Sequence, residues 1–172
     1  GETAECIETG EKDWIRIQLH RDGYVGWVDR KQWSLVSSGT RQFLIQAPVS
    51  SWMRSDGVCL ELLAGSEVGQ GDGSWRLGPW SLEPLDSPDL IFAAHDSAID
   101  VAKQFLGAPY LWGGKSAFGI DCSGLIQLAF GLIGFNVPRD AKDQANVGEA
   151  VPWGSQRPGD VAFFANAEQR VI

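Results

Sequence analysis

Alternating apolar and polar residues predict a β hairpin near the start of the chain. Residues 14–19, written W-I-R-I-Q-L, alternate between the two classes, and β-type sequence resumes at residues 24–28. Residues 21–23, R-D-G, separate the two runs and have turn composition. Because alternate side chains of a strand lie on opposite faces, we expect two antiparallel strands joined by this turn.

Short β-type runs broken by Gly, Asp and Ser continue to about residue 90. Residues 60–68 and 75–82 are the clearest of them and predict a second β unit. Residues 83–89, E-P-L-D-S-P-D, have the Pro, Asp and Ser content of a linker or a capped loop. The expected domains are residues 1–38, 39–90 and 91–172.

The third region is predicted to begin with a helix. Asp96 or Ser97 is suited to cap its N-terminus, Gly107 ends it, and Pro109 prevents its continuation. The expected apolar face consists of Ile99, Ala102, Phe105 and Leu106.

A second helix is predicted to start at Cys122. Asp121 is a plausible N-cap, and Gly134 lies just past the expected end. The apolar residues follow the three-and-four spacing of an amphipathic helix, at Leu125, Leu128, Ala129, Leu132 and Ile133.

After this helix, Asp140 is expected to cap a short helix that reaches about residue 144. Residues 161–165 have the composition of a buried strand. Helices before a strand, preceded by β units, give an α+β fold class.

Composition sets the outer limits on function. The 172-residue chain is 44% hydrophobic and 21% charged, as in ordinary globular proteins. Its net charge of −8 argues against nucleic acid or an anionic membrane as a partner, because phosphate binding needs clustered Lys and Arg. No apolar stretch has the length of a membrane helix.

The three cysteines, Cys6, Cys59 and Cys122, have the spacing of neither a disulfide framework nor a zinc site. We therefore expect no metal and no cofactor. The chain opens on Gly rather than Met and has no apolar signal segment, so we expect that it is cut at both ends.

Cys122 is the candidate nucleophile. At the first turn of a helix, unpaired backbone N–H groups and the helix dipole favour a thiolate. The alternative is that Cys122 is a small buried hydrophobic residue. Nearby glycines favour the first interpretation, because they allow close backbone approach and leave room for a substrate; they are Gly113, Gly114, Gly119 and Gly124.

Several motifs in order make the C-terminal region resemble the NlpC-type bacterial cell-wall peptidases, a papain-like family. They are G-A-P-Y-L-W-G-G at 107–114, D-C-S-G-L at 121–125, V-P-R-D at 137–140 and R-P-G-D-V-A-F-F at 157–164. The resemblance implies a papain-like α+β domain over about the last eighty residues.

The resemblance also implies roles for individual residues. Cys122 would attack an amide carbonyl, and its own N–H and the Tyr110 hydroxyl would donate to the oxyanion. Asp121 and Ser123 would hold the free amine and carboxylate of a peptidoglycan stem peptide, and Trp112 would wall the substrate site. The alternatives are a core aromatic for Tyr110, a helix cap for Asp121, a first-turn residue for Ser123 and simple packing for Trp112.

Residues 22–28, D-G-Y-V-G-W-V, resemble the closing hairpin of bacterial SH3-like barrels, and residues 1–2 resemble a segment that opens the strands before it. The resemblance implies a partial SH3-like barrel at residues 1–38 and a second, more divergent SH3-like unit with a linker at residues 39–90. In multidomain members, an acid and a tyrosine of such a barrel bind the free N-terminal amine of the substrate. By position these are Glu2 and Tyr24. The alternative is that Glu2 is a solvated strand residue and Tyr24 belongs to the barrel core.

Two departures from the family pattern bear on activity. The histidine that activates the cysteine is expected after the 157–164 motif and is not found in this sequence, and His20 and His95 are expected to have surface or capping roles. Ala141 stands where the resemblance predicts a serine, so one substrate hydrogen bond would be missing.

The resemblance implies a murein peptide hydrolase that cleaves the bond between γ-D-glutamate and a diamino acid, on stem peptides with a free N-terminal L-Ala. The 172 residues alone are expected to be inactive. The alternatives are a cell-wall peptide-binding protein with a degenerate peptidase domain and a thiol acyltransferase. The expected location is the bacterial cell envelope, or the cytoplasm if the substrate is recycled murein.

Overall fold

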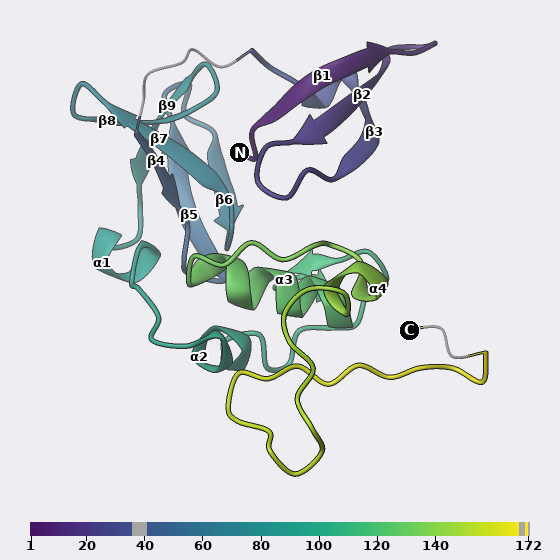
Figure 1. Ribbon diagram of the computed structural model, residues 1–172. Helices are drawn as coiled ribbons and strands as arrows, with labels where there is room; N and C mark the ends of the chain where they lie inside the picture. Colours follow the sequence, from purple (N-terminus) through teal and green to yellow (C-terminus); the bar gives the residue numbers. More distant parts are fainter. Residues whose placement is uncertain (36–40, 169–170, 172) are drawn as a thin grey trace. The chain divides into compact units, whose positions relative to one another are not determined.

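The computed structural model describes residues 1–35, 41–168 and 171, and the chain divides into two compact units, residues 1–93 and 94–172 (Figure 1). The first unit consists mainly of β strands and the second contains the longer helices. The predicted α+β class is therefore confirmed. The predicted division between residues 38 and 39 lies outside the described residues.

The first sheet of unit 1 has the order β1-β2-β3 and is antiparallel; its strands are Ala4–Thr9, Trp14–Leu19 and Val25–Asp29. The predicted hairpin is confirmed, since Arg16 of β2 pairs with Trp27 of β3. Ile15 is buried whereas Trp14 is exposed, as the alternating pattern requires. A short 3₁₀ helix, η1 (Arg30–Gln32), follows β3.

The second sheet of unit 1 has the strand order β4-β7-β8-β9-β5-β6 with antiparallel pairing throughout. Each of the two clearest β-type runs in the sequence, 60–68 and 75–82, is divided between two strands. The strands are β4 (Arg41–Leu44), β5 (Val49–Arg54), β6 (Cys59–Leu63), β7 (Glu67–Gly71), β8 (Ser74–Leu77) and β9 (Trp80–Pro84).

Trp52 lies at the centre of the core of this sheet and is completely buried. Its indole Nε1–H donates to Ser50 Oγ at 2.8 Å, and that hydroxyl donates to the Leu62 carbonyl at 3.1 Å. The buried polar groups are therefore satisfied. Aromatic rings complete the core, with Phe92 stacked on Trp75 at a centroid distance of 4.8 Å.

The predicted linker or capped loop at residues 83–89 comprises the end of β9, a short connection and the start of α1, and it is attached to the second sheet. The Leu85 N–H donates to the Ser51 carbonyl at 2.9 Å, and Asp86 accepts from the Ser51 N–H at 2.6 Å. Ser87 then precedes the short helix α1 (Pro88–Ile91), in which Ile91 is buried in the sheet core. These residues belong to unit 1, and the division between the units falls after residue 93.

Unit 2 begins with α2 (Ala98–Lys103), and Ser97 caps this helix by accepting from the Asp100 N–H at 3.2 Å. The predicted apolar face is wrong in part, because Ile99 and Leu106 are 37% and 82% exposed. The helix ends before Leu106, so the helical period no longer fixes the direction of that side chain. The residues that are buried are Ala98, Val101 and Phe105.

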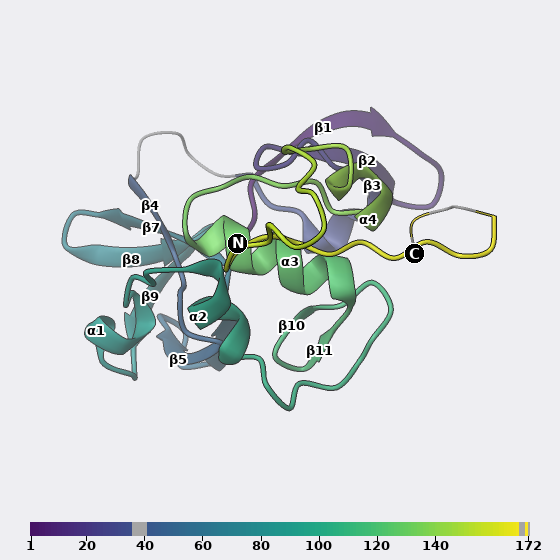
Figure 2. The same cartoon turned by 60° about the horizontal axis from the view of Figure 1, so that its bottom comes forward.

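The second predicted helix is α3 (Cys122–Leu132), and its N-cap is Asp121 as expected. Leu128, Ala129 and Leu132 are buried along it, and Gly134 follows its end with φ +92°. Two short strands, β10 (Lys115–Ser116) and β11 (Gly119–Ile120), precede α3 and lie beside it (Figure 2). The short helix α4 (Ala141–Gln144) follows Asp140, whose side chain makes no capping hydrogen bond.

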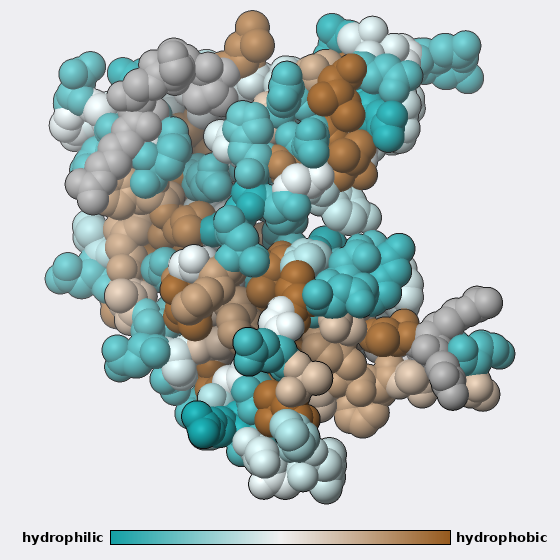
Figure 3. All heavy atoms as spheres, viewed as in Figure 1, coloured by the Kyte–Doolittle hydropathy of each residue, from teal (hydrophilic) through white to brown (hydrophobic). Residues whose placement is uncertain are grey.

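The buried strand predicted at residues 161–165 is not formed. Phe163 and Phe164 are exposed, and only an isolated bridge joins Ala165 to Val171. A buried strand needs neighbouring strands to accept its hydrogen bonds, and the described residues of unit 2 place none beside this segment. Apolar atoms consequently appear on the surface along the C-terminal stretch, as well as over β2 and β3 (Figure 3).

No described helix is long and apolar enough to cross a lipid bilayer.

Adjacent residues of α1 provide a test of the core of unit 1. Ile91 is completely buried whereas Leu90 is 70% exposed. We expect Ile91→Ala to lower the free energy of unfolding of unit 1 by about 2–4 kcal/mol, because a buried aliphatic side chain is lost. Leu90→Ala should change it by less than about 0.5 kcal/mol. Urea denaturation followed by near-UV circular dichroism measures both, and equal losses would contradict the assignment of α1 to this core.

Candidate active site

The loop between α2 and α3 folds back on β11 and brings Tyr110 towards the start of α3. The Ile120 N–H donates to the Pro109 carbonyl at 3.0 Å, and the Leu111 N–H donates to the Ile120 carbonyl at 3.2 Å. Tyr110 is thereby bridged to Ile120, two residues before Cys122. Backbone pairing therefore positions this part of the site.

Glycines at the site are required for close backbone packing. A Cβ atom on Gly114 would collide with the Gly119 carbonyl, and one on Gly124 would collide with the Gly114 carbonyl. Gly113 has φ +80°, a backbone conformation that L residues rarely adopt. The expectation that these glycines leave room for a substrate is therefore wrong at Gly114, Gly119 and Gly124, where protein atoms occupy the space.

Asp121 is the central acceptor of the site and is buried. Its Oδ1 accepts from the Gly124 N–H at 2.7 Å, which caps α3, and its Oδ2 accepts from the Gly113 N–H at 2.8 Å. Burial alone would raise the pKa of Asp121, but hydrogen bonds from Arg139, Gly124 and Gly113 outweigh it and lower that pKa below its usual value. The carboxylate is therefore ionised at neutral pH.

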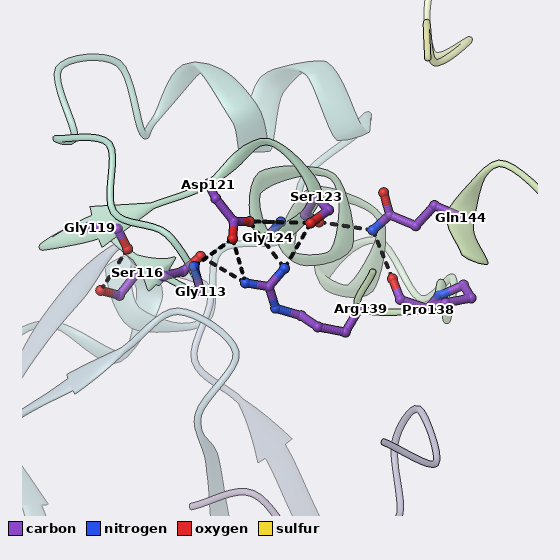
Figure 4. Close-up of polar contacts among 10 residues, drawn as sticks. Gly113, Ser116, Gly119, Asp121, Ser123, Gly124, Pro138, Arg139 and Gln144 are labelled. Atoms are coloured by element: carbon purple, nitrogen blue, oxygen red, sulfur yellow. Dashed lines mark hydrogen bonds and ion pairs between the residues drawn. The ribbon is translucent and has the colours of Figure 1, made fainter. Parts of the chain in front are cut away.

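Arg139 forms a fork on Asp121 that the sequence interpretation did not assign (Figure 4). Its Nη2 lies 2.9 Å from Asp121 Oδ2, and its Nη1 donates to Oδ1 at 3.1 Å and to Ser123 Oγ at 2.9 Å. The Arg139 side chain is only 14% exposed, so the pair is largely shielded from water. Arg139 is part of the V-P-R-D motif at residues 137–140. An arginine is suited to bind a carboxylate with both arms of its guanidinium, so this motif was the sequence signal for a partner of Asp121.

Cys122 is exposed at the first position of α3, where its N–H has no acceptor within the helix. Tyr110 and Trp112 of the preceding loop are also exposed, at 68% and 86%. An accessible thiol beside a free N–H donor is suited to attack a carbonyl and to stabilise the oxyanion that forms. The alternatives of a buried Cys122 and a core Tyr110 do not match these exposures.

Asp121 and Ser123 flank Cys122 but are both buried and contact Arg139. The structure shows the cap role of Asp121 and the first-turn position of Ser123 that were given as alternatives. Contact of either residue with a substrate remains a prediction.

Glu2 and Tyr24 lie at the same end of the first sheet, in unit 1. The His20 N–H donates to the Thr3 carbonyl at 3.0 Å, and the Leu19 N–H donates to the Tyr24 carbonyl at 2.9 Å. Tyr24 is 46% exposed, so it is available at the surface rather than part of a core. Their proposed joint role in amine binding is compatible with this placement within the sheet.

Neither histidine of the described residues is placed as a partner of Cys122, and these residues contain no group of metal ligands. Both ring nitrogens of His95 lie within 3.2 Å of Gln104 Nε2, and His20 is exposed on unit 1. Across residues 1–35, 41–168 and 171, no three His, Cys, Asp or Glu side chains are grouped as a metal site would require.

Comparison with protein families gives two matches. Residues 107–171 match the NlpC/P60 family, and residues 1–32 match the bacterial dipeptidyl-peptidase SH3 domain.

Two curated relatives resemble most of the chain. A γ-D-glutamyl-L-lysine dipeptidyl-peptidase of Bacillus subtilis is 48% identical, over 85% of this chain and 53% of the relative. A protein of the same name from Bacillus cereus is 28% identical, over 90% of this chain and 55% of that protein. The chain thus spans about half the length of the curated relatives it matches.

Among solved structures, the crystal structure of an NlpC/P60 family protein from Bacillus cereus has a TM-score of 0.81 to this chain at 24% identity. The match covers 100% of this chain and 66% of that protein. At this identity the likeness concerns the fold alone.

The Asp121–Arg139 pair predicts an acid-sensitive component of stability. Because the pKa of Asp121 is lowered on folding, the pair stabilises the fold above the unfolded carboxyl pKa of about 3.9, and this stabilisation is lost as the pH falls below it. We expect Asp121→Asn to lower the free energy of unfolding of unit 2 by about 3 kcal/mol at pH 7, and by less at pH 3.

Asp143→Asn, at an exposed position of α4, serves as the control and should show neither effect. Urea titrations at the two pH values measure the differences. A loss for Asp121→Asn that is the same at pH 7 and pH 3 would show that the ion pair is not its source.

Proposed function

We propose that this chain, a member of the NlpC/P60 family with an N-terminal bacterial SH3 domain, is part of a cysteine peptidase that cleaves the γ-D-glutamyl–diamino acid bond of murein stem peptides. The observation that carries the proposal is the exposed Cys122 at the capped start of α3. The names of the two Bacillus relatives support the choice of bond.

In the proposed reaction, Cys122 Sγ attacks the γ-carbonyl carbon of the D-glutamyl residue and forms a tetrahedral oxyanion. The Cys122 N–H donates to that oxygen, and the Tyr110 hydroxyl is the proposed second donor. Collapse of the intermediate breaks the amide bond and leaves a thioester, while the departing amine takes a proton. Water then hydrolyses the thioester and restores the thiol.

A base must accept the thiol proton in this scheme and return it to the leaving amine. The sequence contains two histidines; His20 belongs to unit 1, and the His95 ring contacts Gln104. Because the chain spans about half of its relatives, we propose that the base is supplied by a part of the protein outside these 172 residues.

The proposed specificity is for stem peptides with a free N-terminal L-Ala, bound through Glu2 and Tyr24. A carboxylate desolvated by the substrate needs an ammonium partner, and a substrate still attached to glycan cannot provide one. The exposed positions of both residues at one end of the first sheet support this role.

A cell-wall peptide-binding protein without turnover is the second candidate. One observation favours it: Ala141 stands where the family pattern predicts a serine. Measuring turnover by the protein made from the complete reading frame separates the two candidates. For either of them we propose the bacterial cell envelope, or cytoplasmic murein recycling, as the site of action.

Turnover tests the proposed activity. We expect the protein made from the complete reading frame to release L-Lys from L-Ala-γ-D-Glu-L-Lys, or the diamino acid from the corresponding diaminopimelate peptide, as measured by mass spectrometry. Cys122→Ser should reduce kcat by at least about 1,000-fold, because the thiolate nucleophile is lost. The 172-residue chain should show no turnover.

Cys59→Ser is the matched control, because Cys59 is also an exposed free thiol, and it should retain full activity. Binding without turnover by the complete protein would favour the second candidate. Turnover by the 172-residue chain would mean that the base lies within it, and loss of that turnover in His95→Ala would identify His95 as the base.

The amine specificity is tested by comparing L-Ala-γ-D-Glu-L-Lys with its N-acetylated form. We expect the complete protein to prefer the free amine by at least about tenfold in kcat/KM, since acetylation leaves Glu2 desolvated without a charged partner. Glu2→Gln should slow the free-amine substrate more than the acetylated one. Glu5→Gln, on exposed β1, is the matched control. An equal fall for both substrates in Glu2→Gln would remove Glu2 from amine recognition.

A further inference from the structure

Gln144, the last residue of α4, is a buried amide side chain with no role in the chemistry described above. It is only 3% exposed. Its Nε2 donates to the Ser123 carbonyl at 2.9 Å and to the Pro138 carbonyl at 2.7 Å (Figure 4). One side chain therefore joins the first turn of α3 to the segment that carries Arg139.

The two acceptors are the backbone neighbours of the residues that form the site. Ser123 follows Cys122 directly, and Pro138 precedes Arg139 directly. Since Arg139 binds both Asp121 and Ser123, the same two segments are tied twice, once through the guanidinium and once through the Gln144 amide. The amide fixes the backbone from which the Arg139 fork extends.

A purely structural role would not require an amide at this position. The Gln144 Oε1 atom is buried and accepts no hydrogen bond from the described residues, which is unfavourable for the fold. An apolar side chain of similar size would remove that cost and still fill the space. An apolar side chain could not donate hydrogen bonds to the Ser123 and Pro138 carbonyls. These two acceptors therefore explain why the residue at position 144 is a glutamine.

We propose that Gln144 is a positioning residue for Cys122, acting through Pro138, Arg139 and the Asp121 cap of α3. This inference rests on the proposed role of Cys122 as nucleophile. Loss of the amide leaves the Arg139 segment without its anchor, so the Asp121 cap loosens and the first turn of α3 frays. Cys122 then loses the ordered helix N-terminus that fixes the direction of its thiol and N–H.

The experiment is competitive alkylation of the 172-residue chain with iodoacetamide, read at each cysteine by mass spectrometry between pH 5.5 and 9. Cys6 and Cys59 are also exposed and free, so they are internal references. In the unaltered chain we expect Cys122 to react about two- to fivefold faster than either at pH 7, the advantage of a helix N-terminus. In Gln144→Met this ratio should fall to about one.

Gln127→Met is the matched control. Gln127 is likewise buried in unit 2, and its Nε2 donates to the Val137 carbonyl at 3.2 Å, but that bond does not join Pro138 to the first turn of α3. Its substitution should lower the urea midpoint without changing the Cys122 ratio. An equal fall in the ratio for Gln127→Met and Gln144→Met would overturn the proposal, because general packing would then explain both.

Two further comparisons keep the outcomes distinct. In an Arg139→Lys background, Gln144→Met should produce little additional change, because both act on the same cap; full additivity would overturn the proposed route. If Gln144→Met does not fold, Gln144→Glu is used, which keeps the side-chain length but can donate to at most one of the two carbonyls, and the same fall in ratio is expected.

A ratio near one in the unaltered chain would overturn both the nucleophile assignment and this inference. A high ratio that Gln144→Met leaves unchanged would overturn the role of Gln144 alone, with the proposed function intact.

Discussion

The ion pair between Asp121 and Arg139 is the interaction on which the candidate site depends. The Asp121 carboxylate accepts hydrogen bonds from the N–H groups of Gly113 and Gly124 and from both guanidinium nitrogens that face it. It thereby joins the loop before α3, the first turn of α3 and the segment before α4. The guanidinium in turn keeps the buried carboxylate ionised, which a helix cap in this environment requires.

This arrangement separates residues that support the site from residues that can meet a substrate. Asp121, Ser123, Arg139 and Gln144 are largely buried and bind one another, whereas Cys122, Tyr110 and Trp112 are exposed. A nucleophile needs both conditions, because access is useless without a fixed direction of attack. The tight backbone contact at Gly114, Gly119 and Gly124 serves the supporting set rather than substrate access.

The N-terminal unit shows a comparable division. Its second sheet has an aromatic core around Trp52, whereas the first sheet leaves Trp14, Tyr24 and Trp27 at the surface. Of these, Tyr24 lies at the same end of the sheet as Glu2, as the proposed amine specificity requires. The segment between β9 and α1 is held to β5, because the Ser51 carbonyl accepts from the Leu85 N–H and the Ser51 N–H donates to Asp86.

The sequence by itself determined the features that depend on local chemistry. The period of two predicted β2 and β3, and the three-and-four spacing with Asp121 and Gly134 predicted α3, because capping and amphipathicity act within a few residues. Only the tertiary structure decided which face of α2 is buried, that residues 161–165 form no strand, and that Arg139 and Gln144 meet the start of α3. The Arg139 and Gln144 contacts join residues 16 to 25 positions apart in the sequence, and a buried strand needs other strands beside it. A local sequence pattern does not specify contacts of either kind.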